Sequence, residues 1–339
     1  MPELPEVESL RIGLQKVIIG QKIISIQINN TKIITKRSTL LDVFEWEKLQ
    51  MQNQEIWQKE LIGQIFESVE RRAKNLIITM KTGDLLLVHL KMTGQLVFVP
   101  KNLKKQDNLV EKNVEKLENK LEIEKIKNTK IQNKIKEVEQ VPEIISGGHP
   151  INNITLPNKH THLIFELLNG TLFYNDIRKF GYIYFYQKGK ISKNQFDRLG
   201  KEPLDSSFTL DYLQKSLAKN KGILKKVLLD QKIVVGLGNI YCDEVCFEAR
   251  ILPQRSCQSL TKTEITGLYK SILRIIPLAI SQGGSSISNY LLVDGMRGNY
   301  ADFHLVYGKY GKPCSVCGTI LEKTKIGGRT TTFCPKCQS

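Results

Sequence analysis

Four cysteines close to the C-terminus have the spacing of a metal site. They form two Cys-x-x-Cys pairs with sixteen residues between them, namely Cys314, Cys317, Cys334 and Cys337. Pairs of this kind make two tight knuckles that place four thiolates tetrahedrally around one Zn²⁺. Four sulfur ligands leave no open coordination position. We therefore expect one structural zinc ion per chain, which stabilises a short ribbon and takes no part in catalysis.

The N-terminus carries a second group that could do chemistry. Pro2 follows Met1 directly, and removal of Met1 would expose a secondary amine. An α-amine has a pKa near ~7.7–8.0, against ~10.4 for lysine, so more of it is unprotonated at neutral pH and able to attack an electrophilic carbon. Glu3 beside it could act as a general acid or base. The alternative is a proline-rich helix start, with Glu3 and Glu6 near the positive end of the helix dipole.

The charge balance of the chain indicates a polyanionic partner. The 339 residues include 50 Lys and Arg against 34 Asp and Glu, which gives a formal net charge of +16 and a pI of about 9.4. This balance favours a nucleic-acid partner over a merely lysine-rich protein, although charge carries no information about the fold.

The first half of the chain has the pattern of an antiparallel sheet protein that begins with a helix. Residues 7–17 show the three-to-four spacing of a short amphipathic helix. After it come β-branched runs, many of them separated by Gly, Asn and Asp, which favour a sandwich or a barrel. The runs span residues 22–28, 32–35, 65–69, 75–80, 85–90, 96–99, 162–167, 171–174 and 182–186.

Residues 101–140 interrupt this pattern with a different composition. They are rich in Lys, Glu, Asn and Ile, and they contain no Gly, Pro or aromatic residue. A heptad-like register is broken at Glu124 and Asn128, so no clean coiled coil results. We interpret this segment as a solvated, partly helical insertion in a strand-strand loop, without a role in chemistry.

The second half of the chain is helical and predicts a second domain. Apolar residues recur three or four apart in four segments, 210–217, 222–229, 240–247 and 263–280. A Gly- and Ser-rich stretch, 282–299, follows the last of them and could act as a mobile lid.

Five short segments stand out in order along the chain. They are Pro2-Glu3-Leu4-Pro5-Glu6-Val7, Arg71-Arg72-Ala73-Lys74, His89-Leu90-Lys91-Met92-Thr93-Gly94, Asp176-Ile177-Arg178-Lys179-Phe180-Gly181 and Val235-Gly236-Leu237-Gly238-Asn239-Ile240-Tyr241. With the cysteine ribbon that follows them, these segments resemble the motifs of formamidopyrimidine-DNA glycosylases. The resemblance covers essentially the whole chain apart from residues 101–150.

The resemblance implies an α+β, multidomain fold. A catalytic, antiparallel β-sandwich domain with an N-terminal helix would occupy residues 1–199, with 101–150 as a lysine- and glutamate-rich insertion. A helical, DNA-binding domain of the helix-two-turn-helix type would span residues 200–305. A β-hairpin zinc ribbon would form residues 306–339.

The resemblance also implies a base-excision repair enzyme that removes oxidised purines and then cuts the DNA strand as an abasic-site lyase. Pro2 would attack the anomeric carbon of the damaged nucleotide and Glu3 would protonate the opening sugar, which gives a Schiff base. Lys74 is similar to the family's lyase lysine in the β-elimination that follows. Arg329 matches the arginine to which the family's δ-elimination is attributed.

Six positions match residues that hold DNA in the family. Three of them would fill the gap that a flipped base leaves, since a stacked base hides its sugar from attack; these are Met92, Arg178 and Phe180. Contacts to the DNA backbone would come from His160, from Lys221 and from Asn239 in the turn between two helices. Arg178 would take part in these contacts too.

Two departures and two matches refine the resemblance. The departures are the long insertion, which is atypical of the family, and two substitutions in one loop. Ile177 and Lys179 replace the Pro and the second Arg that are commonest in that loop, and Lys179 lacks the planar fork of an Arg. Leu4 favours the oxidised-purine branch, because the sister branch of endonuclease VIII, which acts on oxidised pyrimidines, typically has Gly there. The loop 282–299 is also long enough to cover a flipped purine.

Two alternative functions stay open: an endonuclease VIII-like enzyme for oxidised pyrimidines, and a DNA-binding paralogue that has lost catalysis. In each case the expected partner is double-stranded DNA, with the protein a monomer and no membrane involved. We expect a cytoplasmic, nucleoid-associated protein, with an organelle as an alternative. No targeting peptide opens the chain, and three further cysteines outside the ribbon are scattered, which is typical of free thiols in a reducing compartment.

Overall fold

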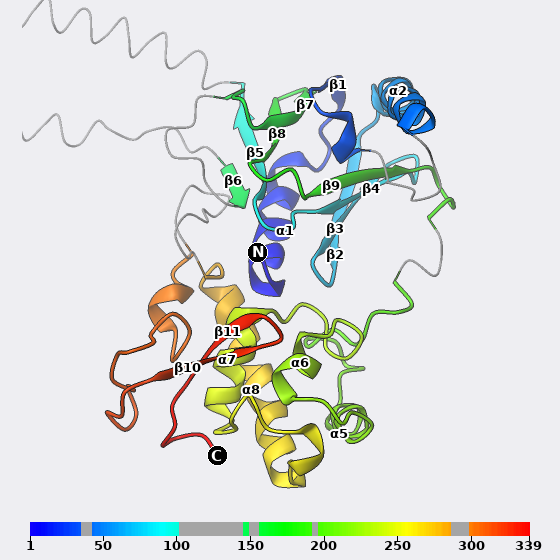
Figure 1. Cartoon of the computed structure of the whole chain (residues 1–339). Helices are drawn as coiled ribbons and strands as arrows, with labels where there is room; N and C mark the ends of the chain where they lie inside the picture. Colours follow the sequence, from blue (N-terminus) through cyan, green and yellow to red (C-terminus); the bar gives the residue numbers. More distant parts are fainter. Residues whose placement is uncertain (35–42, 102–144, 149–155, 192–195, 286–297) are drawn as a thin grey trace, which may run out of the picture.

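The computed structural model of the chain has a β-rich part and a helical part (Figure 1). Side chains of residues 43–50 and 145–148 are not among those described. The structure describes residues 1–34, 43–101, 145–148, 156–191, 196–285 and 298–339.

The β-rich part consists of two antiparallel sheets and the N-terminal helix. One sheet has the order β1-β7-β8-β5-β6, and the other has the order β2-β3-β4-β9. A single core of buried residues draws on both sheets and on helix α1 (Leu4–Ile18). The strands are β1 (Ile23–Ile28), β2 (Phe66–Arg72), β3 (Asn75–Met80), β4 (Leu85–His89), β5 (Gly94–Pro100), β6 (Ile145–Gly148), β7 (Thr161–Leu167), β8 (Gly170–Asp176) and β9 (Tyr182–Tyr186).

Helix α1 forms because its apolar residues share one face. Val7, Leu10, Leu14 and Ile18 are each at most 1% exposed and pack against the sheets. The amphipathic helix expected at residues 7–17 is confirmed, and it begins three residues earlier, at Leu4.

The predicted strand at residues 32–35 is wrong. Residues Thr31–Ile33 form a 3₁₀ turn (η1), which the side chain of Asn30 caps by accepting a hydrogen bond from the Lys32 amide at 3.2 Å. Ile33 and Ile34 are both buried, whereas adjacent residues of a strand point to opposite faces.

Two elements were not foreseen. Helix α2 (Val43–Leu61) buries Trp57 and Leu61 in the core of the sheets. These two anchors are four residues apart in a polar sequence, which gives a weak periodic signal. Strand β6 lies inside the predicted insertion 101–150 and pairs with β5, while residues 102–144 lie outside the described ones.

The helical part has its own core. It is built by α5 (Leu210–Ala218), α6 (Leu224–Leu229), α7 (Asn239–Glu248), the 3₁₀ turn η3 (Cys257–Ser259) and α8 (Lys262–Ser281). All four predicted helical segments are confirmed, with shifted ends. No helix of the described residues is long and apolar enough to cross a membrane. The domain boundaries at 199/200 and 305/306 stay predictions.

The C-terminal hairpin joins β10 (Glu322–Ile326) to β11 (Arg329–Phe333), after the 3₁₀ turn η4 (Tyr300–Phe303). A fully buried ion pair attaches it to the helices. The Lys225 ammonium lies 2.5 Å from the Asp243 carboxylate and 2.8 Å from the Thr331 hydroxyl, and the other Asp243 oxygen accepts from the Thr332 amide. Breaking one side of such a pair costs ~3–5 kcal/mol, so the hairpin is fixed on α6 and α7.

Candidate active site and metal centre

The N-terminal segment lies between the β-rich part and the helical part (Figure 1). Pro2 and Glu3 are buried, and the Leu4 amide donates to the Gly236 carbonyl at 3.0 Å. Gly236 has a φ of +84°, and a Cβ there would lie 2.4 Å from that of Leu4. The glycine is therefore needed both for its backbone conformation and for this close approach.

The Glu3 carboxylate caps helix α7. Its two oxygens accept from the amides of Ile240 at 2.9 Å and Tyr241 at 3.3 Å, which are orphan donors in the first turn of that helix. Gly238, just before the helix, makes room, since a Cβ there would lie 2.3 Å from Glu3 Cδ. The catalytic candidate is thus held by a segment more than 230 residues away in the sequence.

Glu6 connects the N-terminus to Ser285, which lies shortly after the end of helix α8. One carboxylate oxygen accepts from the Glu3 amide at 2.7 Å, and the other accepts from the Tyr241 hydroxyl and from the Ser285 amide, both at 2.7 Å. The Ser285 hydroxyl in turn lies 2.8 Å from His304 Nε2. Burial and the nearby Glu3 charge raise the pKa of Glu6.

Lys74 reaches the same place from the turn between β2 and β3. Its ammonium donates to the Leu237 carbonyl at 2.8 Å, and the residue is 7% exposed. Burial lowers the pKa of Lys74, against the opposing effect of the Glu3 charge. A buried lysine with a lowered pKa is suited to proton transfer near neutral pH.

The same charges act on the N-terminal amine. In the full-length chain this amine belongs to Met1, and burial lowers its pKa. Glu3 and Glu6 oppose that shift, while Lys74 and Arg178 add to it. The N-terminus and three of the predicted site residues therefore share one electrostatic environment.

Arg329 begins β11 and is exposed at the tip of the hairpin. Its charge contributes to the lowered pKa of Lys74. Asn239, the first residue of α7, donates from Nδ2 to the neighbouring Thr330 carbonyl at 3.0 Å. The hairpin tip thus contacts the phosphate-binding candidate Asn239, and the charge of Arg329 acts on the lyase candidate Lys74.

Two loops present the three residues predicted to fill the gap of a flipped base. Phe180 is 60% exposed and Met92 is 37% exposed, and Arg178 is exposed too. The loops are joined, because the hydroxyl of Thr93 donates to the buried Asp176 carboxylate and accepts from the Arg178 amide at 3.0 Å. Large apolar side chains left exposed on a fixed scaffold are typical of a contact surface.

The remaining DNA-binding candidates lie apart from this cluster to different degrees. His160 is half-buried, and its carbonyl accepts from the Asp176 amide at 3.0 Å, at the base of the Arg178 loop. Lys221 is exposed between α5 and α6, and no hydrogen bond or ion pair of the described residues joins it to the site. The roles of all these residues stay predictions.

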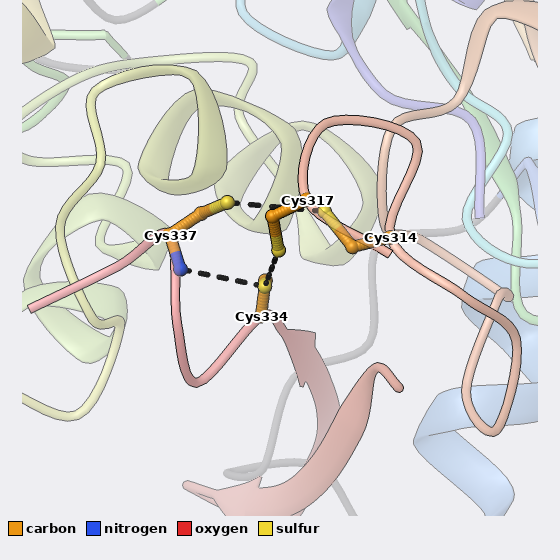
Figure 2. Close-up of side chains that lie close together, drawn as sticks. All are labelled: Cys314, Cys317, Cys334 and Cys337. Atoms are coloured by element: carbon orange, nitrogen blue, oxygen red, sulfur yellow. Dashed lines mark hydrogen bonds between the residues drawn. The ribbon is translucent and has the colours of Figure 1, made fainter. Parts of the chain in front are cut away.

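The four ribbon cysteines lie together with their thiols converging (Figure 2). All four Sγ atoms are within 4.8 Å of one another; Cys314 and Cys337 are 3.9 Å apart, and Cys317 and Cys334 are 3.5 Å apart. Zn–S bonds of about 2.3 Å in a tetrahedron place sulfurs about 3.8 Å apart, so the cluster fits a metal ion of that kind.

Sequence reasoning missed the two residues that bind the Glu6 carboxylate from the helical part. Tyr241 and Ser285 bind the Glu6 carboxylate, but both are more than 230 residues from it in the chain. Glu6 itself could have been found, because a carboxylate three residues after Glu3 has the spacing of a capping box. The predicted lid 282–299 falls mostly outside the described residues, at 286–297.

Comparisons with known proteins agree with this geometry. Three family patterns match the chain: "Formamidopyrimidine-DNA glycosylase N-terminal domain" over residues 1–183, "Formamidopyrimidine-DNA glycosylase H2TH domain" over 199–290 and "Zinc finger found in FPG and IleRS" over 311–339.

Relatives and solved structures match over full length. The formamidopyrimidine-DNA glycosylase of Bacillus cereus is 34% identical over 340 residues, which cover 100% of this chain and 99% of the relative. The Lactococcus lactis enzyme bound to DNA with an abasic site has a TM-score of 0.74 at 30% identity, with 99% of each chain covered. A point mutant of that enzyme, bound to DNA that contains Fapy-dG, gives a TM-score of 0.74 at 30% identity, with 100% of each chain covered.

The chain belongs to the formamidopyrimidine-DNA glycosylase family of DNA repair enzymes, as the sequence similarity over its full length, the three matching family patterns and the shared architecture show.

Proposed function

We propose that this protein removes oxidised purines from double-stranded DNA and then cuts the strand at the abasic site. The observation that carries the proposal is the placement of Pro2 and Glu3, buried against the first turn of α7 and sharing an electrostatic environment with Lys74. The related Lactococcus lactis protein in complex with Fapy-dG DNA supports an oxidised purine as the substrate.

In the first step the Pro2 amine, freed by removal of Met1, attacks the anomeric carbon of the damaged nucleotide. The bond from that carbon to the base breaks, and the base leaves with the electron pair and takes up the proton that the Pro2 nitrogen releases. Glu3 donates a proton to the sugar oxygen as the ring opens, which yields an iminium ion on Pro2. The Ile240 and Tyr241 amides then stabilise the Glu3 carboxylate that remains.

In the second step the iminium ion acidifies the neighbouring C2′ proton. We assign the acceptance of this proton to Lys74, a role that its lowered pKa supports, because it leaves more free amine than an exposed lysine has. The electron pair released forms a double bond and expels the 3′ phosphate. Arg329, on the hairpin tip near Lys74, assists a second elimination that expels the 5′ phosphate.

Binding uses charge and exposed side chains. The net charge of +16 attracts the DNA backbone, and Asn239, His160, Lys221 and Arg178 hold phosphates. Met92 and Phe180 enter the gap left by the flipped nucleotide. We expect one monomer to bind one lesion.

We further propose that the ribbon cysteines hold one Zn²⁺ per chain. Four thiolate ligands leave no coordination position for a substrate. When bound, the metal supplies folding energy to the ribbon, and the catalytic steps stay with Pro2, Glu3, Lys74 and Arg329.

The test is single-turnover excision on duplexes that contain 8-oxoguanine, a formamidopyrimidine or an oxidised pyrimidine. We expect faster excision of the two purine lesions and cut products that carry phosphates at both ends of the gap. Glu3→Gln should lower excision by about 10² or more, since proton donation is lost. Binding without excision by the Met1-free protein would instead identify a non-catalytic paralogue. Faster excision of the pyrimidine would identify the endonuclease VIII-like alternative.

A further inference from the structure

The turn that carries Lys74 has an unfavourable backbone. Arg72 pairs with Asn75 across the β2–β3 hairpin, which leaves a two-residue turn of Ala73 and Lys74. Ala73 has a φ of +55°, in the left-handed region. This conformation is unfavourable for a residue with a Cβ, and tight hairpin turns normally place Gly or Asn there. Something outside the hairpin must hold this turn.

A single carboxylate from the start of the helical part does so. Glu202 accepts from the Ala73 amide at 2.7 Å and from Arg72 Nη1 at 3.0 Å with one oxygen, and from Arg71 Nη1 at 2.8 Å with the other. Arg71 Nη1 also donates to the Ala73 carbonyl at 2.9 Å, and Arg72 Nη2 donates to the Gly200 carbonyl at 2.7 Å. Hydrogen bonds to an ionised group are stronger than those between neutral groups, and the three that converge on this carboxylate offset the cost of the turn.

The backbone next to Glu202 pairs with the segment that binds the Lys74 ammonium. Lys201 forms a bridge to Val234, three residues before Leu237, whose carbonyl accepts from Lys74. Glu202 thus holds the residue before Lys74, and Leu237 binds the Lys74 ammonium, both from the helical part.

We propose that Glu202 is a positioning residue for Lys74: its carboxylate holds the Ala73 turn and thereby sets how deeply the Lys74 ammonium enters the site. The proposed effect on strand cleavage rests on the lyase role assigned to Lys74 above. The positioning itself does not.

Loss of this carboxylate lets the turn relax and the ammonium reach solvent. The groups whose charges act on Lys74 are Glu3 in the N-terminal segment, Glu6 on α1, Cys242 on α7 and Arg329 on β11. Burial is the largest cause of its lowered pKa, so exposure raises that pKa toward the ordinary value for lysine. For each unit of increase, the free amine present below the pKa falls about tenfold.

The experiment compares full-length Glu202→Gln with Glu8→Gln. Glu8 is the other partner of Arg71, at 2.9 Å from Nε, but it does not contact the turn. The apparent pKa of Lys74 is measured by trace acetylation over a pH series with peptide mass spectrometry, which requires no activity. Single-turnover β-elimination is measured on a preformed abasic-site duplex. We expect Glu202→Gln to raise the pKa by about one unit and to slow elimination about tenfold at neutral pH, with Glu8→Gln within about twofold of the parent.

A second change separates positioning from general stability. Adding Ala73→Gly to Glu202→Gln removes the cost of a positive φ, so the double variant should recover most of the loss in both readouts. If Glu202→Gln folds too poorly to measure, Glu202→Asp keeps the charge and shortens its reach, and the same pattern is expected. An unchanged acetylation pKa of Lys74 in a folded Glu202 variant overturns the proposal. A raised pKa with unchanged elimination leaves the positioning intact and contradicts only the lyase role of Lys74.

Discussion

Access of Glu3 to helix α7 depends on the absence of a side chain at position 238. The Glu3 carboxylate replaces the missing hydrogen-bond partners of two amides, and the backbone on either side is held by Gly236 and by Glu6. The acid that is proposed to protonate the sugar is therefore pre-organised before any DNA arrives. A group held in this way loses little entropy when the substrate binds.

Gly238→Ala should damage catalysis more than folding. The new methyl group would lie 2.3 Å from Glu3 Cδ, so Glu3 must move away from the α7 amides. We expect a loss of stability of about 1–3 kcal/mol and a fall in single-turnover excision of about 10² or more. Gly267→Ala in α8 is the control, since nothing lies within 4 Å of a Cβ there. Full excision by Gly238→Ala would contradict the placement of Glu3 described here.

At the scale of elements, the zinc ribbon is a small structure that owes its shape to the cysteines and to its attachment. Among the described residues, the buried cluster at the ribbon consists of Val306, Cys314, Leu321 and Cys334 with Phe247 of α7, and three partly buried residues pack against it. So small a core cannot fold a ribbon alone, and structural metals commonly supply the difference. The buried Lys225–Asp243 pair then orients the hairpin and its Arg329 toward the site.

Joint substitution of Cys317→Ser and Cys334→Ser should release the metal. We expect metal analysis to fall from about one zinc per chain to near zero, with weakened binding of lesion DNA and an intact N-terminal sheet core. Cys257→Ala, which changes a buried thiol far from the ribbon in sequence, should keep its zinc. Full zinc occupancy in the double serine variant would rule out the four-thiolate site.

In the molecule as a whole, the two parts meet at the candidate active site. The N-terminal segment, the Lys74 turn and the Glu202 carboxylate all meet at that interface. The sequence of residues 101–140 contains neither aromatic residues on which bases could stack nor an unbroken apolar seam, so we expect no role for it in catalysis.

Deletion of residues 102–140 with a short Gly-Ser bridge should leave excision of oxidised purines largely intact at moderate salt. Lys101 is kept because its ammonium donates to the Leu168 carbonyl at 3.0 Å. Lost lysines should weaken binding only at low salt, since counterion release drives that contribution. Single-turnover rates of parent and deletion, compared at two salt concentrations, test this. A folded deletion variant without excision would assign the segment to the catalytic machinery.

The sequence predicted those parts of the site that are local. The cysteine spacing, the Pro2-Glu3 opening and the helix at residues 7–17 depend on neighbours in the chain. Contacts such as Glu3 with α7, or Glu202 with the Ala73 turn, join residues more than 120 positions apart and leave no periodic signal. The error at residues 32–35 has a local cause instead: the side chain of Asn30 caps a 3₁₀ turn two residues on, and this capping overrode the β-branched pattern.

The central claim is that the nucleophile is the Pro2 amine. Borohydride trapping on a duplex with an oxidised purine, followed by peptide mapping, tests it most directly, because reduction fixes the Schiff base to the amine that formed it. We expect the DNA to be found on Pro2 of the chain that lacks Met1, and we expect no trapping of chains that retain Met1. A crosslink on Lys74 or on any other internal lysine would contradict it.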